Sequence, residues 1–300
     1  MAFSRRAAAV LVIFFIAPAA PHAQAVQRSL YVSVLNDAGA PVPDLGPSDF
    51  IVREDGLARE VLRVVPATDP MQIAVLVDNS QAARDDIADL RKALHAFVTA
   101  MTAGSAAGVK NELAIIGLAD RPTILADYTS DAARLRKGID RVFSTPQSGT
   151  LLLQGIIDVC KGFKTREAAR PVIVAITTEG PELSDRYYDL VLEPLLASGA
   201  AFHAIVLGPP RGGTSDAERD RGIVLDRGTR ETGGRRDNVL TSMSLTPKLT
   251  ELAAELTHQY KITYAHPQSL IPPEHVTVAA AKAGMTARGT LIKERQQRKP

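Results

Sequence analysis

Several oxygen-bearing side chains come directly after apolar runs of this sequence or in turns between them, and together they could bind a divalent cation. Asp78 and Ser80 come directly after the apolar run 73–77. Thr150 ends a glycine-led turn before a predicted helix, and Glu179 follows an apolar run that ends in "AITT". Carboxylate and hydroxyl oxygens suit Mg²⁺ and Mn²⁺, whose remaining coordination positions are filled by water. The sequence therefore offers a candidate site for Mg²⁺ or Mn²⁺.

This set of side chains has two defects, so a metal-free interpretation stays open. Ala82, two residues after Ser80, has no oxygen to give. Glu179 is one methylene longer than an aspartate, and Mg²⁺ tolerates misplaced ligands poorly. In the alternative, Asp78 and Ser80 hydrogen-bond the loop that follows them, and Thr150 caps its helix. We keep both hypotheses: a weakened cation site, and a site that holds no cofactor.

Residues 71–259 have the pattern of an α/β domain that would position these side chains. Short apolar runs alternate with segments in which apolar residues recur every three or four positions. Strands buried on both faces are typical of a doubly wound, mainly parallel sheet, whose ligands bind at the carboxyl ends of the strands. The expected strands are 73–77, 112–119, 122–128, 171–178 and 201–208, and the expected helices are 84–102, 131–143, 151–164 and 185–198.

The segment 209–240 is harder to assign. We expect a helix that Gly233 and Gly234 terminate, then a short strand, and a further helix that begins at Thr246 and Pro247. Arginines alternate with acidic residues along the first of these helices. This pattern predicts a solvated face rather than a surface for nucleic acid.

Shorter β segments flank the α/β region on both sides. Residues 26–68 contain the alternating run "LYVSVL" and an Asp55-Gly56 pair between two strand-like runs, which is a strong hairpin signal. Residues 260–292 have the pattern of three further strands. Neither segment is large enough to fold alone. We expect them to pair with each other, so that an α/β domain, 69–259, is inserted in a small β-sandwich.

The first 25 residues have the pattern of a signal peptide. Arg5 and Arg6 precede the apolar run "AAAVLVIFFIA", and the small residues "AQA" follow it. That run is shorter than the roughly 20 apolar residues needed to cross a bilayer. We therefore expect an exported protein, periplasmic or secreted, with no membrane span in the mature chain. The polar tail 293–300 is expected to be disordered.

Composition and motifs argue against several classes of function. Arg5 and Arg6 account for two of the 35 basic residues, so the chain after the leader has 33 basic and 33 acidic residues. Such a balance does not predict nucleic acid as a partner. Cys160 is the single cysteine, so no intrachain disulfide can form. No nucleophile elbow, phosphate loop or zinc-binding "HExxH" motif occurs. His203 lies within an apolar run and is expected to be structural, and we predict that the protein is not an enzyme.

In these motifs the chain resembles the von Willebrand factor type A (VWFA) family, over residues 71–259. The metal-ion-dependent adhesion site of that family uses Asp-x-Ser-x-Ser, a threonine and an aspartate. Here "DNSQA" supplies the first two ligands and lacks the third, "SGT" supplies the threonine, and "TTEG" has glutamate in place of aspartate. The resemblance implies a Rossmann-like type A fold. It also implies a degenerate metal site with the ligands Asp78, Ser80, Thr150 and Glu179.

The flanks resemble a bacterial subfamily, the VWFA-related proteins, through "DFIVREDG" before the domain and "HQY" at 258–260. The resemblance implies an adhesion-type module that binds a protein partner through the loops at the carboxyl edge of its sheet. A weakly held cation would take part if one is bound. The alternative is a structural or assembly component of the cell envelope that acts through the β-sandwich without metal.

Overall fold

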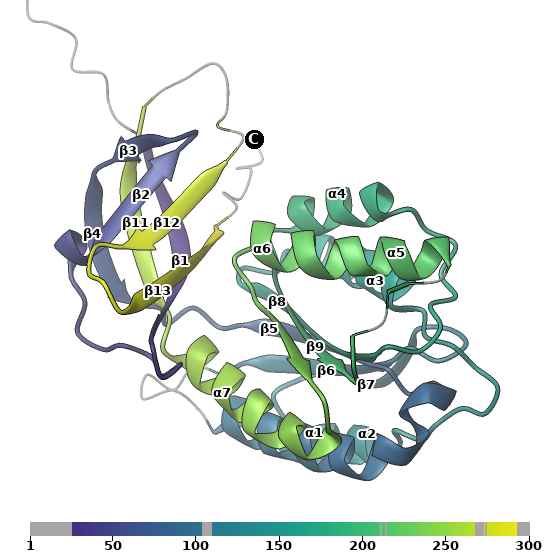
Figure 1. Cartoon of the computed structure of the whole chain (residues 1–300). Helices are drawn as coiled ribbons and strands as arrows, with labels where there is room; N and C mark the ends of the chain where they lie inside the picture. The colour runs from purple at the N-terminus through teal and green to yellow at the C-terminus, as the bar shows by residue number, and fades with distance from the viewer. Residues whose placement is uncertain are drawn as a thin grey trace, which may run out of the picture.

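The computed structural model describes residues 26–103, 110–210, 212–213, 215–267, 273 and 275–292. The expected signal peptide, 1–25, and the expected disordered tail, 293–300, lie outside these residues. The described chain forms an α/β domain and a β-sandwich, which pack against each other at one end of the α/β sheet (Figure 1). Within these described ranges, no helix has the length and apolar character needed to cross a membrane.

A mainly parallel sheet forms the centre of the α/β domain. Its strand order is β10-β9-β8-β5-β6-β7, and only β6 and β7 pair antiparallel. The chain order reverses between β5 and β8, and both strands are buried along nearly their whole length. The strands are β5 (Gln72–Val77), β6 (Glu112–Gly117), β7 (Thr123–Thr129), β8 (Pro171–Thr178), β9 (Ala201–Leu207) and β10 (Arg236–Val239).

Helices cover both faces of this sheet, as the continuous apolar strands require. The first face is covered by α1 (Ile87–Thr102), α2 (Ala132–Ile139) and α7 (Leu245–Thr257) (Figure 1). The second face is covered by α3 (Leu152–Thr165), α4 (Tyr188–Ser198) and the segment formed by α5 (Asp216–Ile223), a π turn (Val224–Gly228) and α6 (Thr229–Glu231). A 3₁₀ turn (Gln81–Asp86) leads into α1. The predicted doubly wound α/β fold is confirmed.

The two terminal segments pair in two antiparallel sheets. One sheet has the order β13-β1-β11-β4 and the other β12-β2-β3. In each, a strand from the N-terminal segment lies beside strands from the C-terminal segment. The α/β domain is therefore inserted in a β-sandwich. The strands are β1 (Val26–Asn36), β2 (Phe50–Glu54), β3 (Leu57–Arg59), β4 (Val61–Pro66), β11 (Tyr260–His266), β12 (Val276–Ala280) and β13 (Met285–Leu291).

The predicted hairpin joins β2 to β3. Asp55 and Gly56 both have positive φ, 47° and 83°, which a two-residue turn of the primed type requires. The residue before them, Glu54, is buried and accepts hydrogen bonds from the hydroxyl of Tyr264 at 2.9 Å and from Nδ1 of His266 at 2.8 Å. Because β2 and β11 belong to different sheets, this carboxylate links the two layers of the sandwich.

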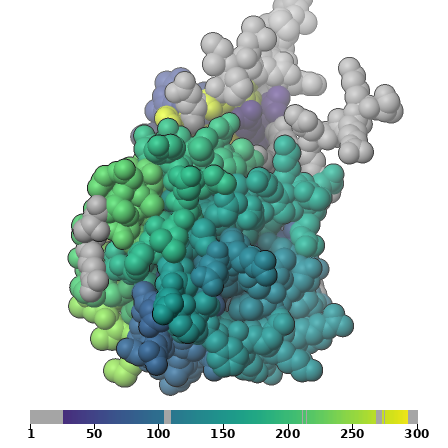
Figure 2. Space-filling view, turned by 90° about the vertical axis from the view of Figure 1, so that its right-hand side faces the viewer, coloured from purple at the N-terminus to yellow at the C-terminus, as the bar shows by residue number. Residues whose placement is uncertain are grey.

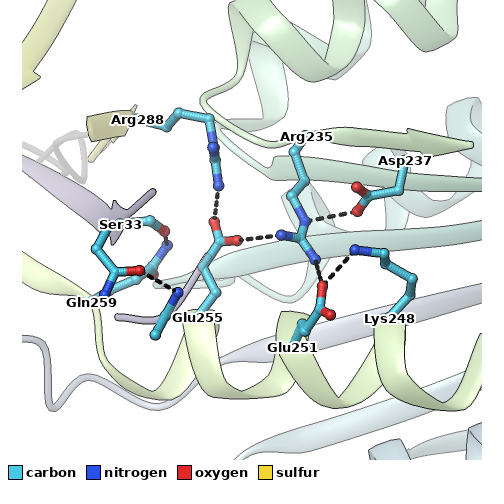
Figure 3. Close-up of polar contacts among 10 residues, drawn as sticks. Ser33, Arg235, Asp237, Lys248, Glu251, Glu255, Gln259 and Arg288 are labelled. Carbon is cyan, nitrogen blue, oxygen red and sulfur yellow. Dashed lines mark hydrogen bonds and ion pairs between the residues drawn. The ribbon is translucent and has the colours of Figure 1, made fainter. Parts of the chain in front are cut away.

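A second buried carboxylate, Glu255 on α7, ties the α/β domain to the sandwich (Figure 3). Its exposure is 1%, and one of its oxygens accepts a hydrogen bond from Nη2 of Arg288 on β13 at 2.7 Å. The other oxygen lies 3.5 Å from Nη1 of Arg235, just before β10. His203 on β9 is buried near this group, and burial lowers its pKa to about 4. Two guanidinium groups from separate elements therefore neutralise one buried charge.

Further contacts at the same junction are short and polar. Oε1 of Gln259 accepts a hydrogen bond from Arg170 at 2.6 Å. Its Nε2 donates one to the Ser33 hydroxyl on β1 at 2.9 Å (Figure 3). The backbone of Gly233 passes so close to β13 that an added Cβ would lie 2.1 Å from the carbonyl oxygen of Gly289. Gly233 also has a φ of 77°, so a side chain there would be strained as well as crowded.

Replacing Glu255 by glutamine should strongly destabilise the protein. The substitution removes the charge that Arg288 and Arg235 share, although Arg235 keeps its ion pair to Asp237 at 2.8 Å. Arg288 loses its ion-pair partner, and breaking a buried pair in this way costs about 3–5 kcal/mol. Urea unfolding at neutral pH measures the loss. Glu231→Gln is the control, because it breaks an ion pair to Arg227, 3.0 Å long, on an exposed helical surface. Equal effects of the two substitutions would contradict the role given to Glu255.

Candidate binding site at the carboxyl edge of the central sheet

The predicted site residues meet at the carboxyl edge, where the chain order reverses. Asp78 and Ser80 follow β5, and Glu179 follows β8. Thr150 reaches the same edge, because it forms β-bridges with Ala119 after β6 and with a residue of the loop after β8. The amino ends of the strands face the sandwich, so this edge lies on the opposite side of the domain (Figure 1), and Figure 2 looks onto that side.

The carboxylate of Asp78 joins the ends of β5 and β8. Its exposure is 1%, and its Oδ1 accepts a hydrogen bond from the backbone N–H of Ser80 at 2.9 Å. Its Oδ2 accepts from the backbone N–H of Thr178 at 3.0 Å and from the hydroxyl of that residue at 2.7 Å. A carboxylate has about four lone-pair directions, so these three donors leave little capacity for a metal. Thr178 was missed in the sequence, although it is the second threonine of "TTEG".

The hydroxyls of Ser80 and Thr150 are buried, and neither has a hydrogen-bond partner among the described residues. A buried hydroxyl left unpaired costs about 1–3 kcal/mol, and a buried water commonly satisfies such groups. These two groups are therefore the part of the set that can still take up a small polar ligand.

Thr150 does not cap α3, so that part of the metal-free hypothesis is wrong. The cap comes from the loop after β8, where Oε2 of Glu182 accepts a hydrogen bond from the N–H of Leu152 at 3.3 Å. The hydroxyl of Ser184 accepts from the N–H of Gln154 at 3.1 Å. A carboxylate at a helix N-terminus is stabilised by the free N–H groups there. The sequence holds no signal for this cap. A capping residue normally comes directly before its helix, whereas Glu182 and Ser184 come after α3 in the chain.

Glu182 is almost fully buried, with an exposure of 3%. Burial raises its pKa to about 7, although hydrogen bonds from Ser184 and the charge of Arg221 act in the opposite direction. The protonated and ionised forms of this carboxyl group are therefore close in free energy near neutral pH.

Glu179 is paired with an arginine. Its Oε2 lies 3.6 Å from Nη2 of Arg221 on α5, and Nη1 of Arg221 donates a hydrogen bond of 2.6 Å to the carbonyl oxygen of Gly180. Arg221 is only 4% exposed, so the prediction that this helix presents a solvated face is wrong at this position. Ala82 packs against Gly180, where an added Cβ would lie 2.4 Å from the Ala82 methyl.

These residues do not fit a divalent cation. Asp78 already accepts three hydrogen bonds, and the charge of Glu179 is balanced by Arg221. Of the four predicted metal ligands, only the hydroxyls of Ser80 and Thr150 are left without a hydrogen-bond or ion-pair partner among the described residues. In the part of the chain that the structure describes, no group of three or more His, Cys, Asp or Glu side chains could hold a metal ion.

The titration of Glu182 predicts a pH-dependent stability. Its pKa is about 7 in the folded protein and near 4.5 in the unfolded chain, so the folded state binds more protons between these values. The contribution of Glu182 to the free energy of unfolding should therefore fall, by up to about 3 kcal/mol, as pH rises from 4.5 to 7. The buried His203, whose pKa is lowered to about 4, acts in the opposite direction over this range, so the measured quantity is the difference between the wild type and Glu182→Gln. Urea unfolding should show that this difference changes with pH, whereas Asp185→Asn, an exposed position in the same loop, should follow the wild type at every pH. A difference that stays constant from pH 4.5 to 7 would contradict this prediction.

The sequence matches no family model and no curated protein. The structure is similar to a von Willebrand factor type A protein from Catenulispora acidiphila, with 12% identity and a TM-score of 0.51, over 91% of this chain and 74% of that chain. It is also similar to proximal thread matrix protein 1 from the mussel byssus, with 18% identity and a TM-score of 0.51, over 68% of this chain and 51% of that one. Likeness at such low identity concerns the fold alone. The chain has the von Willebrand factor type A fold that its sequence predicted.

Proposed function

We propose that this protein is a non-enzymatic interaction module that binds a protein partner through the loops at the carboxyl edge of its central sheet. Large apolar side chains exposed on those loops carry the proposal. Large apolar side chains exposed on the loops of one edge are a feature of protein-interaction surfaces, where apolar area is kept accessible for a partner. The residues are Leu183 and Tyr187 after β8, Phe143 before α3, and Leu240 and Met243 after β10, with exposures of 57%, 69%, 62%, 71% and 76%.

The loops that carry these side chains are held in place. The amide of Asn79 donates a hydrogen bond of 3.0 Å to the carbonyl oxygen of Phe143, and the guanidinium of Arg91 lies 4.2 Å from the centre of the Phe143 ring. The loop after β10 is held by Ser242, whose hydroxyl donates to Asp89 on α1 at 2.8 Å. Preorganised loops lose less conformational entropy on binding, which favours affinity.

The surroundings of Ser80 support a non-enzymatic function. A serine nucleophile needs a base within hydrogen-bond reach. The Ser80 hydroxyl is buried and has no such partner in the described parts of the chain.

Export is a further part of the proposal. It is supported by the leader-like pattern of residues 1–25, and the proposed location is the periplasm or the outside of the cell. N-terminal sequencing of the protein purified from its source cells should find a chain that starts near Val26. A chain that retains residues 1–25 would contradict cleavage of a leader.

A second candidate function is favoured by exposed leucines on the sandwich. Leu57 on β3 and Leu62 on β4 are exposed, and both strands lie at the edge of a sheet. Edge strands offer unpaired backbone groups to a further strand. On this alternative the protein is a structural or assembly component of the cell envelope, and the sandwich is its binding surface.

Charge substitutions on the two surfaces distinguish these functions. Leu183→Asp should weaken binding to a partner cross-linked in extracts of the source cells by about tenfold or more, as loss of a central apolar contact does. Leu57→Asp, a matched exposed leucine on the sandwich, should leave the cross-linked product unchanged. The opposite result would favour the envelope component. Full binding by both variants would contradict both functions.

A further inference from the structure

The guanidinium of Arg221 reaches the candidate site from α5, in the segment between β9 and β10. It lies between the side chain of Glu179 and the carbonyl oxygen of Gly180, at 3.6 Å and 2.6 Å. Its charge also acts on the carboxyl group of Glu182. With an exposure of 4%, it contacts the loop after β8 and almost no solvent. A permanent positive charge therefore lies among the acidic residues of this edge.

We propose that Arg221 is the resident cation of this site and that the loops reach their binding conformation without a divalent metal. The inference rests on the proposed function only in taking these loops to bind a protein partner. The absence of metal binding can be tested on the isolated protein.

One arrangement explains both departures from the metal-site pattern. The extra methylene of Glu179, relative to aspartate, extends its carboxylate toward Arg221. Ala82 has a methyl group where a hydroxyl ligand would otherwise stand, and this methyl packs against Gly180. Gly180 is the residue whose carbonyl oxygen accepts the hydrogen bond from Arg221. The two substitutions and the buried arginine therefore act on the same short loop.

The electrostatics favour arginine over a metal. A guanidinium is charged at all physiological pH values and presents several donors in one plane, so it can bind a carboxylate and a carbonyl oxygen together. A divalent cation at Glu179 would lie beside that charge and be repelled by it. The donors from Ser80 and Thr178 leave one lone-pair direction of the Asp78 carboxylate open, so they weaken a metal site there without excluding it.

Calorimetric titration with Mg²⁺ and with Mn²⁺ tests the inference on three proteins. The wild type should show no saturable binding. Ala82→Ser with Glu179→Asp restores the ligands of the metal-site pattern but keeps Arg221, and it should still bind no metal. Adding Arg221→Gln to that pair should produce saturable binding. Saturable binding by the wild type, or equal affinity in the double and triple variants, would overturn the inference.

Thermal unfolding keeps the test decisive if the triple variant does not fold. The melting temperature of the wild type should be the same in EDTA and in excess Mg²⁺, since there is no metal to remove or add. A melting temperature that rises with Mg²⁺ concentration would overturn the inference. Partner binding, once measured, should likewise be insensitive to EDTA. Leu183→Asp tests partner binding by the loops and does not test metal binding. The proposed function and the inference about Arg221 can therefore fail separately.

Discussion

One buried carboxylate, Glu255, lies at the contact that joins the two parts of the molecule. The chain leaves the sandwich after β4 and returns from α7 directly into β11, so the inserted domain is attached at its amino edge. There Glu255 binds Arg288 of the sandwich and Arg235 of the α/β domain, while Gln259 bridges Arg170 and β1. Because this edge is covered, the carboxyl edge is the one left open. The position of the candidate binding surface thus follows from a contact on the far side of the sheet.

Much of this architecture could be predicted from local sequence patterns. β8 and β11 begin and end where apolar continuity and alternation place them, at 171–178 and 260–266. Asp55 and Gly56 form the turn that their residue types favour. These features depend on neighbouring residues only, so one sequence contains the information. The pairing of the two flanking segments could be predicted as well, since each is too small to fold alone.

The chemistry of the site depends on contacts between distant segments, and there the sequence was a poorer guide. Arg221 stands among alternating charges typical of a solvated helix, yet it contacts a loop 41 residues earlier and is buried. The cap of α3 comes from Glu182, beyond the helix, instead of from Thr150. His203 is buried as predicted, but neither ring nitrogen has a hydrogen-bond partner among the described residues. No periodicity in a sequence encodes such contacts.

The order of strands in the sandwich has a consequence for how the chain folds. Although β1 is made early, its partners are β11 and β13, and the contact between Ser29 and Thr263 spans 234 residues. Closing so long a loop is slow, whereas the inserted domain has all its strands available before β11 is synthesised. During that interval β1 is an apolar strand with both edges unpaired, the kind of segment that aggregates. The strand pairing therefore predicts that the sandwich is completed last, and that an incomplete chain is most prone to aggregate before that step.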